Sequence, residues 1–407
     1  MISLFRHKKR ISSENTSNDV IEYDNQTNRI ELKGNVIQSK PEFDHLQSKT
    51  VLINPIMAGT RNLGKNVAQK LSDYGSNVGN MLFVEAIKEQ LIFEKELSPG
   101  PQRGKSLDSC SMVIPSSNFI IRGDTMFIER LQQLLNTTKG LVTVAGLGAQ
   151  SNSKDDTPKK LVSELKPYKI KFFKELSERA VSLGIRGEFT AACLEEMGIY
   201  NYRIIGCPSA YRYFDGKYRV KQPSTERCVF NVTTMNPMES KIVRLGIQEK
   251  APWIMQMMTE LPTTALEGKE MSEREFQNLF PELGISKEEL TDFMRKYAHM
   301  FFSYQEWSSY LQENDFTFSF GSRFHGNMFA LRNGVPALWI THDSRTSELV
   351  NTLHLPSIDY STLKKVTSVE QLAQYCDYNA FVNEYRKLTE NYVQFLNENH
   401  LAHKFVL

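Results

Sequence analysis

The sequence has few cysteines and no long hydrophobic run, and each shortage excludes a class of protein. Its cysteines are Cys110, Cys193, Cys207, Cys228 and Cys376. They are odd in number, widely spaced and never arranged as CxxC, which argues for reduced thiols and against a zinc site. No segment approaches the roughly 18 consecutive apolar residues of a membrane-spanning helix. The basic residues from Arg6 to Arg10 are not followed by the apolar core of a signal peptide, so we expect a cytoplasmic protein.

The net charge is also small. The 49 Lys and Arg residues nearly cancel the 47 Asp and Glu residues, so no overall field points to nucleic acid. The stretch from Lys159 to Lys174 is locally basic and interleaves its lysines with Tyr168, Phe172 and Phe173. We interpret it as a solvated helix face. The alternative is a patch that rests on an anionic membrane, which would make the protein peripheral at the inner membrane face.

Cofactor motifs are absent as well. The sequence has no GxGxxG fingerprint for dinucleotides, no Walker loop and no His/Cys/Asp cluster with metal-ligand spacing. We therefore expect no metal site and no nicotinamide or flavin cofactor.

The most informative part of the chain is a pair of polar turns, Gly321-Ser322-Arg323-Phe324-His325-Gly326 and His342-Asp343-Ser344-Arg345. Each follows a short apolar run, Thr317–Phe320 or Val335–Ile340, and a short helix is predicted between them. A strand, a helix and a strand within about 25 residues form a βαβ unit. Both turns then fall at the carboxyl edge of a parallel sheet, where such sheets bind ligands.

The residue types in these turns favour an anion. Arg323 and Arg345 offer planar donors that match carboxylate or phosphate. His325 lies near the start of the predicted helix, where the backbone N–H groups and the helix dipole also favour negative charge. An imidazolium is disfavoured there until an anion arrives, so we expect proton uptake by His325 to accompany binding.

The alternation of strands and helices predicts an α/β fold in two domains. Residues 1–48 are polar and are interpreted as a weakly ordered extension with a small hairpin formed by Ile30–Leu32 and Val36–Ile37. A first doubly wound domain is predicted over residues 49–222 and a second over residues 223–407.

In the second domain, the pattern predicts one helical stretch from Ser240 to Leu261 and a helical hairpin or a lid between Glu267 and Tyr297. The last helix, Ala380–Asn399, carries an apolar stripe that predicts docking on the rest of the protein. The stripe is formed by Phe381, Tyr385, Leu388, Tyr392 and Phe395.

The two polar turns, with the residues that follow as far as Leu349, resemble the polysaccharide pyruvyl transferase family. Three weaker matches occur in the family's order. They are Ser76-Asn77-Val78-Gly79-Asn80, Ile185-Arg186-Gly187-Glu188-Phe189-Thr190 and Gly206-Cys207-Pro208-Ser209. Together the matches extend over residues 51–360.

The resemblance implies a GT-B-like fold, with two Rossmann-like domains facing a central cleft. It implies transfer of the pyruvyl group of phosphoenolpyruvate onto two hydroxyls of a saccharide, which forms a cyclic ketal and releases phosphate. Phosphoenolpyruvate is then a co-substrate, and the pathway is cell-surface or exopolysaccharide biosynthesis. The acceptor sugar, its linkage to a lipid and the oligomeric state are left open.

The resemblance also assigns residues. Arg323 and Arg186 match donor-binding positions, and His325 matches the family's motif histidine. His325 is either the general acid/base or a fixed hydrogen-bond donor to phosphate. We expect the donor to be bound by Arg186, Ser322, Arg323, His325, His342, Ser344 and Arg345. We expect the acceptor side of the cleft to include Asn77, Asn80, Glu188 and Asp343.

One position departs from the family, which often has an acid where this chain has Asn80. An amide cannot act as a base, so Glu188, Asp124 and Asp343 are the alternative carboxylates. Glu188 could instead cap its own helix, and Asp343 could orient its neighbours.

Two other functions therefore stay open: a GT-B glycosyltransferase with a nucleotide-sugar donor, and a non-catalytic relative that binds an anion or a saccharide. The first would need contacts to a base and a ribose, which we cannot identify in the sequence. The second would bind its ligand without releasing phosphate.

Overall fold

The computed structural model describes residues 20–24, 29–33, 49–56, 64–100, 107, 110–123, 126–136, 138–151, 156–233, 238–257, 260–279 and 282–407. The chain divides into two compact units, Met1–Gln47 and Ser48–Leu407. In the first unit, β1 (Val20–Asp24) and β2 (Arg29–Lys33) pair antiparallel.

The described residues cover only one arm of the predicted amino-terminal hairpin. Ile30–Leu32 lies within β2, but the partner strand precedes it in the chain. The β-branched and aromatic residues of Val20–Asp24 suit a strand, and the sequence interpretation overlooked them. The other predicted arm, Val36–Ile37, and most of the predicted polar extension lie outside the described residues.

The second unit contains two parallel sheets. The first has the strand order β4-β3-β5-β7-β8-β9, with β6 beside β7. Its strands are β3 (Lys49–Ile53), β4 (Lys95–Leu97), β5 (Cys110–Pro115), β6 (Asn118–Ile120), β7 (Val142–Ala149), β8 (Leu183–Ile185) and β9 (Tyr202–Ile204). Its helices are α1 (Val67–Asp73), η1 (Val78–Asn80), α2 (Met81–Gln90), α3 (Met126–Leu135), α4 (Pro158–Ser163), α5 (Pro167–Glu178), α6 (Glu188–Glu196) and η2 (Pro208–Ala210). We call this part, residues 49–211, the first lobe.

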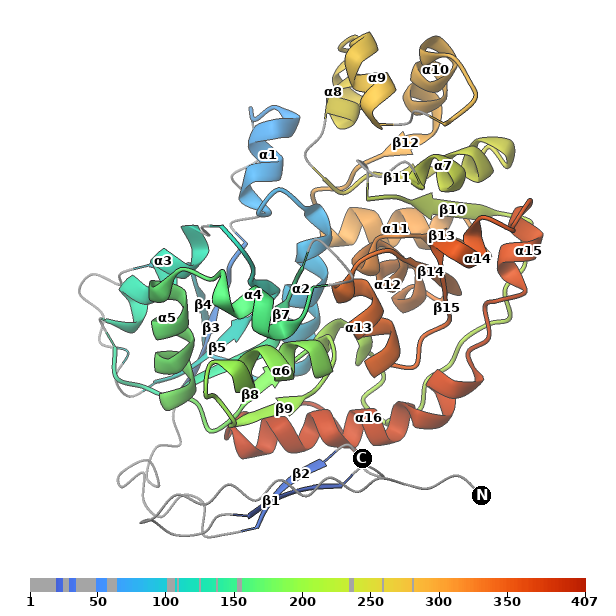
Figure 1. Ribbon diagram of the computed structural model, residues 1–407. Coiled ribbons are helices and arrows are strands. Elements are labelled where there is room, and N and C mark those ends of the chain that lie inside the picture. Colours follow the sequence, from blue (N-terminus) through green and yellow to red (C-terminus); the bar gives the residue numbers. More distant parts are fainter. Residues whose placement is uncertain are drawn as a thin grey trace. The chain divides into compact units, whose positions relative to one another are not determined.

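The second sheet has the strand order β12-β11-β10-β13-β14-β15, which reverses direction between β10 and β13. Its strands are β10 (Cys228–Asn231), β11 (Trp253–Ile254), β12 (Ala298–His299), β13 (Phe318–Gly321), β14 (Ala337–Thr341) and β15 (Ser357–Asp359). Its helices are α7 (Glu239–Gln248), α8 (Glu260–Glu267), α9 (Glu273–Leu279), α10 (Lys287–Tyr297), α11 (Tyr304–Glu313), α12 (Phe324–Arg332), α13 (Ser344–Thr352), α14 (Tyr360–Leu363) and α15 (Val369–Ala373). We call residues 228–373 the second lobe. The α/β class with two parallel, Rossmann-like sheets is confirmed (Figure 1).

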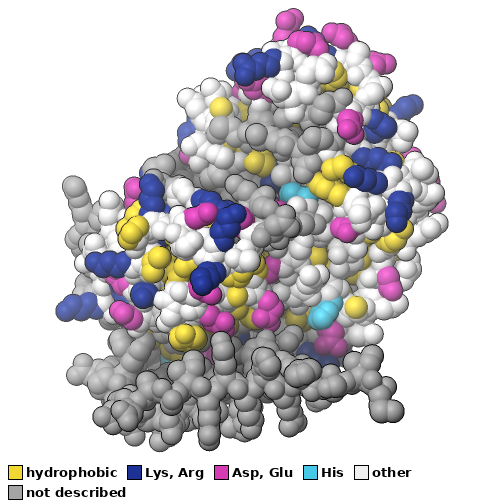
Figure 2. All heavy atoms as spheres, viewed as in Figure 1, with side chains coloured by type: hydrophobic (Ala, Val, Ile, Leu, Met, Phe, Trp, Pro, Cys, Tyr) yellow, Lys and Arg dark blue, Asp and Glu magenta, His cyan; other side chains and the backbone are white. Residues whose placement is uncertain are grey.

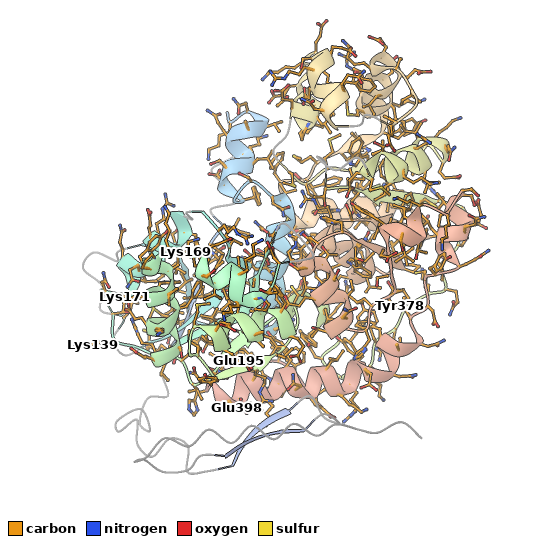
Figure 3. All side chains as sticks on the ribbon, viewed as in Figure 1. Lys139, Lys169, Lys171, Glu195, Tyr378 and Glu398 are labelled. Atoms are coloured by element: carbon orange, nitrogen blue, oxygen red, sulfur yellow. The ribbon has the colours of Figure 1, made fainter. Side chains whose placement is uncertain are left out.

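The carboxyl-terminal helix α16 (Asn379–Glu398) runs along both lobes (Figure 1). Before its start, the Tyr378 hydroxyl donates to the Ala337 carbonyl in β14 at 2.7 Å. At its end, Glu398 accepts from Nε of Arg203 in β9 at 3.1 Å (Figure 3). Four of the five predicted stripe residues are fully buried, and Leu388 is partly buried. The predicted docking helix therefore holds the lobes together.

One predicted helical segment differs from the structure. The stretch Ser240–Leu261 is interrupted by β11, and β12 follows directly after the predicted helical hairpin. Both strands have only two residues, which is too short for a period of two to show in the sequence. The hairpin itself is present as α9 and α10.

The basic stretch lies on α4 and α5. Lys169 is fully buried and donates to the Ile121 carbonyl at 2.9 Å, whereas Lys171 is exposed (both labelled in Figure 3). Its lysines therefore do not share one face. No helix in the described ranges has the length and apolar character needed to cross a membrane.

Candidate functional site

The site begins where the strand order of the second sheet reverses, between β10 and β13. At this point Gly321 approaches Asn231 so closely that a Cβ would lie 1.9 Å from the Asn231 carbonyl oxygen. The Asn231 side chain accepts from the Arg323 backbone N–H at 2.9 Å and donates to Oδ1 of Asn327 at 2.7 Å. These bonds fix the start of α12, so Arg323 and His325 leave the sheet at the crevice where doubly wound folds bind ligands.

Side chains of both lobes line one pocket at this edge. They are Asn77, Arg186, Gln256, Arg323, Phe324, His325, Arg345 and Leu349. The free space between them is about 10 Å³, roughly the room for one water molecule. A larger ligand therefore needs the lining side chains to move apart.

Arg186 enters the pocket from the first lobe. Its Nε donates to the Gly146 carbonyl at 2.9 Å and its Nη1 to Oδ1 of Asn118 at 2.5 Å. The side chain is 1 % exposed, and burial lowers the pKa of its guanidinium. Arg345 lowers this pKa further, while Glu348 and Cys207 oppose the shift. The cation is thus held rigidly in place.

Two more arginines come from the second lobe and keep open donors. Burial, followed by the charge of Arg345, lowers the pKa of Arg323 to about 9. Its Nε reaches the Val232 carbonyl at 3.4 Å, but its buried Nη2 has no partner among the described residues. Arg345 lies 3.5 Å from Asp343, and its buried Nε also finds no partner in the part of the chain that the structure describes. Crowded guanidiniums with unused donors form a site that an anion would stabilise.

His325 lies among the arginines. Burial lowers its pKa well below the usual value, and Arg186, Arg345 and Arg323 add to the shift. Its Nε2 lies 3.6 Å from Sγ of Cys207. The imidazole is therefore neutral in the free protein. An anion that neutralises the arginines would raise its pKa, so proton uptake on binding stays a prediction.

The remaining predicted donor residues surround the pocket rather than line it. Ser322 is fully buried and donates to Oε2 of Glu239 at 2.8 Å. His342 stacks on Tyr360 with a ring distance of 6.0 Å, and burial lowers its pKa. The Ser344 hydroxyl accepts from a backbone N–H of the first lobe, that of Ser151, at 3.3 Å.

Asp343 has a local role. One carboxylate oxygen accepts from the Thr346 backbone N–H at 2.7 Å and so caps α13. The other lies 3.5 Å from both His342 and Arg345. Burial opposes ionisation, but Arg345, His342 and the bonds to Thr346 hold the pKa of this carboxyl at about 2. The geometry fits the alternative that Asp343 orients its neighbours.

Of the predicted acceptor residues Asn77, Asn80 and Glu188, only Asn77 lines the pocket. Asn77 lines the pocket, and its side chain accepts from the Gly79 backbone N–H at 3.0 Å. Asn80 instead donates to the Tyr74 carbonyl at 3.0 Å and does not line the pocket. Glu188 is exposed at the first position of α6. Asp124 lies outside the described residues.

Two buried polar residues were missed by the sequence interpretation. Glu239 is fully buried at the start of α7, where it accepts from the Ser322 and Tyr360 hydroxyls and from the Thr233 backbone N–H. An acidic residue in the first turn of a helix after a strand was its available signal. Gln256 follows β11, in a segment predicted as helix, and nothing in the sequence marked it.

The surface near the site is locally cationic. On the face shown in Figure 2, Lys and Arg side chains gather over α7 and α14, whereas both signs are interspersed over the first lobe. Lys241, Arg244 and Lys364 border a hollow beside the start of α7. Glu282 also lines this hollow, so its charge is mixed.

Comparison with known proteins agrees with this geometry. Residues 162–344 match the family model described as polysaccharide pyruvyl transferase, which confirms the resemblance over the segment that contains Arg186, Arg323 and His325. No curated protein matches the chain.

Several solved structures show a remote likeness. MnaA from S. aureus bound to UDP has 12% sequence identity and a TM-score of 0.40, covering 86% of this chain and 97% of that one. A protein of Klebsiella pneumoniae described as uncharacterized has 9% identity and a TM-score of 0.37, covering 75% and 88%. Os79 T291V from O. sativa with UDP has 10% identity and a TM-score of 0.33, covering 87% and 95%. These sequence identities and TM-scores are too low to support an argument, so the fold is assigned from the strand order of the two sheets alone.

Proposed function

We propose that this chain transfers the pyruvyl group of phosphoenolpyruvate onto two hydroxyls of a saccharide, in the assembly of a cell-surface or exported polysaccharide. The observation that carries the proposal is the convergence of Arg186, Arg323 and Arg345 on one pocket. Phosphoenolpyruvate has a carboxylate and a phosphate, so it needs at least two separate cationic groups. The unused donors of Arg323 and Arg345 are suited to these two anions.

In the proposed reaction, the methylene carbon of phosphoenolpyruvate gains a proton while a saccharide hydroxyl oxygen bonds to the adjacent carbon. The bond from that carbon to the phosphate oxygen breaks, and phosphate leaves with the electron pair. The second hydroxyl then closes the ketal. Of the two hydroxyl protons, one ends on the new methyl group and the other on the released phosphate. The balance requires no oxidant or reductant.

His325 is the proposed proton carrier. Burial, and then the surrounding arginines, lower its pKa in the free protein, so it can accept a proton when the anionic donor binds and neutralises the arginines. The other role open to it is a fixed hydrogen bond to the phosphate. The domain assignment follows the same proposal, with residues 49–222 contributing Arg186 and residues 223–407 contributing the motif.

Calorimetric titration tests the donor. Phosphoenolpyruvate, UDP-sugars and GDP-sugars are titrated into wild type, Arg323→Ala and the control Arg295→Ala, which removes an exposed arginine on α10. The proposal predicts saturable binding of phosphoenolpyruvate that only Arg323→Ala removes. Binding of a nucleotide-sugar, with phosphoenolpyruvate silent, would replace pyruvyl transfer with glycosyl transfer.

A further inference from the structure

Gln256 presents a buried amide to the pocket without any hydrogen-bond partner. The residue is 2 % exposed, and neither its Oε1 nor its Nε2 has a partner within the described parts of the chain. Its side chain lines the same pocket as Arg323 and His325. Buried amides are nearly always paired, so an amide left unpaired at a pocket wall indicates a group that a ligand completes.

The backbone holds this amide in place from both lobes. The Val78 N–H donates to the Gln256 carbonyl at 2.9 Å, and Met257 forms an antiparallel bridge with Asn77. This pairing connects Asn77 and Val78 of the first lobe to the residues that follow β11. The segment that carries Gln256 is therefore fixed at the junction of the lobes.

Two glycines confine the side chain. A Cβ added at Gly79 of the first lobe would lie 2.6 Å from Oε1, and one added at Gly326 of the second lobe would lie 2.3 Å from Nε2. The amide therefore lies between the backbones of the two glycines, with one end close to each. Its two ends can be exchanged without loss, because either orientation presents one donor and one acceptor side by side.

The chemistry of the amide distinguishes it from the arginines. A carboxylate or a phosphate dianion only accepts, so it would satisfy Nε2 and leave Oε1 facing negative charge. Two adjacent hydroxyls satisfy both ends, since one accepts from Nε2 and the other donates to Oε1. Ketal formation needs two hydroxyl oxygens of one saccharide to bond to the same carbon of the donor.

We infer that Gln256 binds the pair of acceptor hydroxyls, in the same pocket whose arginines hold the donor. The inference rests on the proposed function for the identity of the donor. It makes Gln256 a determinant of which diol can react.

The test compares wild type with Gln256→Met, which keeps the length of the side chain and removes both hydrogen-bonding ends. The matched control is Gln248→Met, at an exposed position at the end of α7. The melting temperature of the free protein should be unchanged or higher in Gln256→Met, because its amide is unpaired without ligand. A fall would assign Gln256 a structural role and overturn the inference.

Binding is then measured by saturation-transfer NMR with methyl β-D-galactopyranoside, methyl β-D-glucopyranoside and methyl α-D-mannopyranoside as probes. At least one should bind wild type and the control, and its affinity should fall about tenfold to 100-fold in Gln256→Met. Phosphoenolpyruvate affinity should stay within about threefold in the same variant, because charged donors hold that ligand. Equal saccharide binding by all three proteins, or none by wild type, would overturn the inference. Absence of phosphoenolpyruvate binding in wild type would instead remove the proposed function and leave the saccharide result to be judged separately.

Discussion

The Glu348 carboxylate in α13 accepts hydrogen bonds from both the backbone N–H and the hydroxyl of Thr190, at 2.7 and 3.1 Å. It thereby pairs an N–H in the first turn of α6 from the opposite lobe, which is a favourable place for negative charge. Burial nevertheless dominates and raises the pKa of Glu348 to about 7, although the bonds to Thr190 and the charge of Arg186 oppose the shift. Glu188 adds a smaller upward shift. The junction of the lobes therefore contains a carboxyl group that titrates near neutrality.

Glu348→Gln should remove a pH dependence of stability. Because the folded protein holds the Glu348 proton more tightly than the unfolded chain, the free energy of unfolding should fall as pH rises from 4.5 through about 7. The fall attributable to this group is at most about 3 kcal/mol. Glutamine keeps an acceptor for Thr190 and does not titrate. The free energy of unfolding of Glu348→Gln should therefore depend less on pH than that of wild type. Urea unfolding at several pH values checks this, and parallel curves for the two proteins would refute it.

Arg323→Met should weaken donor binding without weakening the fold. Loss of the charge-assisted bonds should lower phosphoenolpyruvate affinity about 100-fold or more. The melting temperature should be unchanged or higher, because a buried cation with an unpaired Nη2 has been removed. Calorimetry and thermal unfolding give the two readouts. Wild-type affinity in the variant would exclude Arg323 from the donor site.

His325→Gln should abolish proton uptake on donor binding. In two buffers of different ionisation enthalpy near pH 7, wild type should take up as much as about one proton per phosphoenolpyruvate bound. The variant should take up none, since glutamine does not titrate. If His325→Gln turns over at nearly the wild-type rate while Arg323→Ala is inactive, proton transfer by His325 is wrong and the fixed hydrogen-bond role is favoured.

Arg332→Met should loosen the contact between the lobes. Arg332 in α12 is 1 % exposed, donates to the Ser209 carbonyl at 2.9 Å and pairs with Glu89. Its removal leaves a buried carbonyl unpaired, which should cost about 1–3 kcal/mol of unfolding free energy. Arg295→Met, at an exposed position on α10, is the matched control and should lie within about 0.5 kcal/mol of wild type. Equal stabilities of the two variants would contradict this account.

The sequence predicted the parts of the fold whose pattern is local. The unit β13–α12–β14 was recognisable because its apolar runs are bounded by Gly321 and Gly334. The two-residue strands β11 and β12 depend on pairing with distant strands, so no local periodicity revealed them.

The candidate site was predictable to a similar extent. Arg186 and Arg323 each follow the carboxyl end of a parallel strand, where such sheets bind ligands. They belong to different sheets, however, and no local pattern shows that the two lobes bring them to one pocket. Gln256 could not be found, because a single glutamine has no pattern and its meaning depends on Gly79 and Gly326, which approach it only in the folded chain. Likewise, Asn80 lies in a matching motif but turns its amide toward Tyr74.

The central claim is transfer of a pyruvyl group, and labelled turnover tests it most directly. Phosphoenolpyruvate with ¹³C at its second carbon is incubated with the protein and a panel of cell-envelope saccharides, and ¹³C and ³¹P NMR follow the reaction. The account predicts that a quaternary ketal carbon and inorganic phosphate appear together in equal amounts, with wild type and not with Arg323→Ala. A nucleotide-sugar is added to the same mixture as a competing donor. If it is consumed while the ¹³C label remains in phosphoenolpyruvate, the claim of pyruvyl transfer is contradicted.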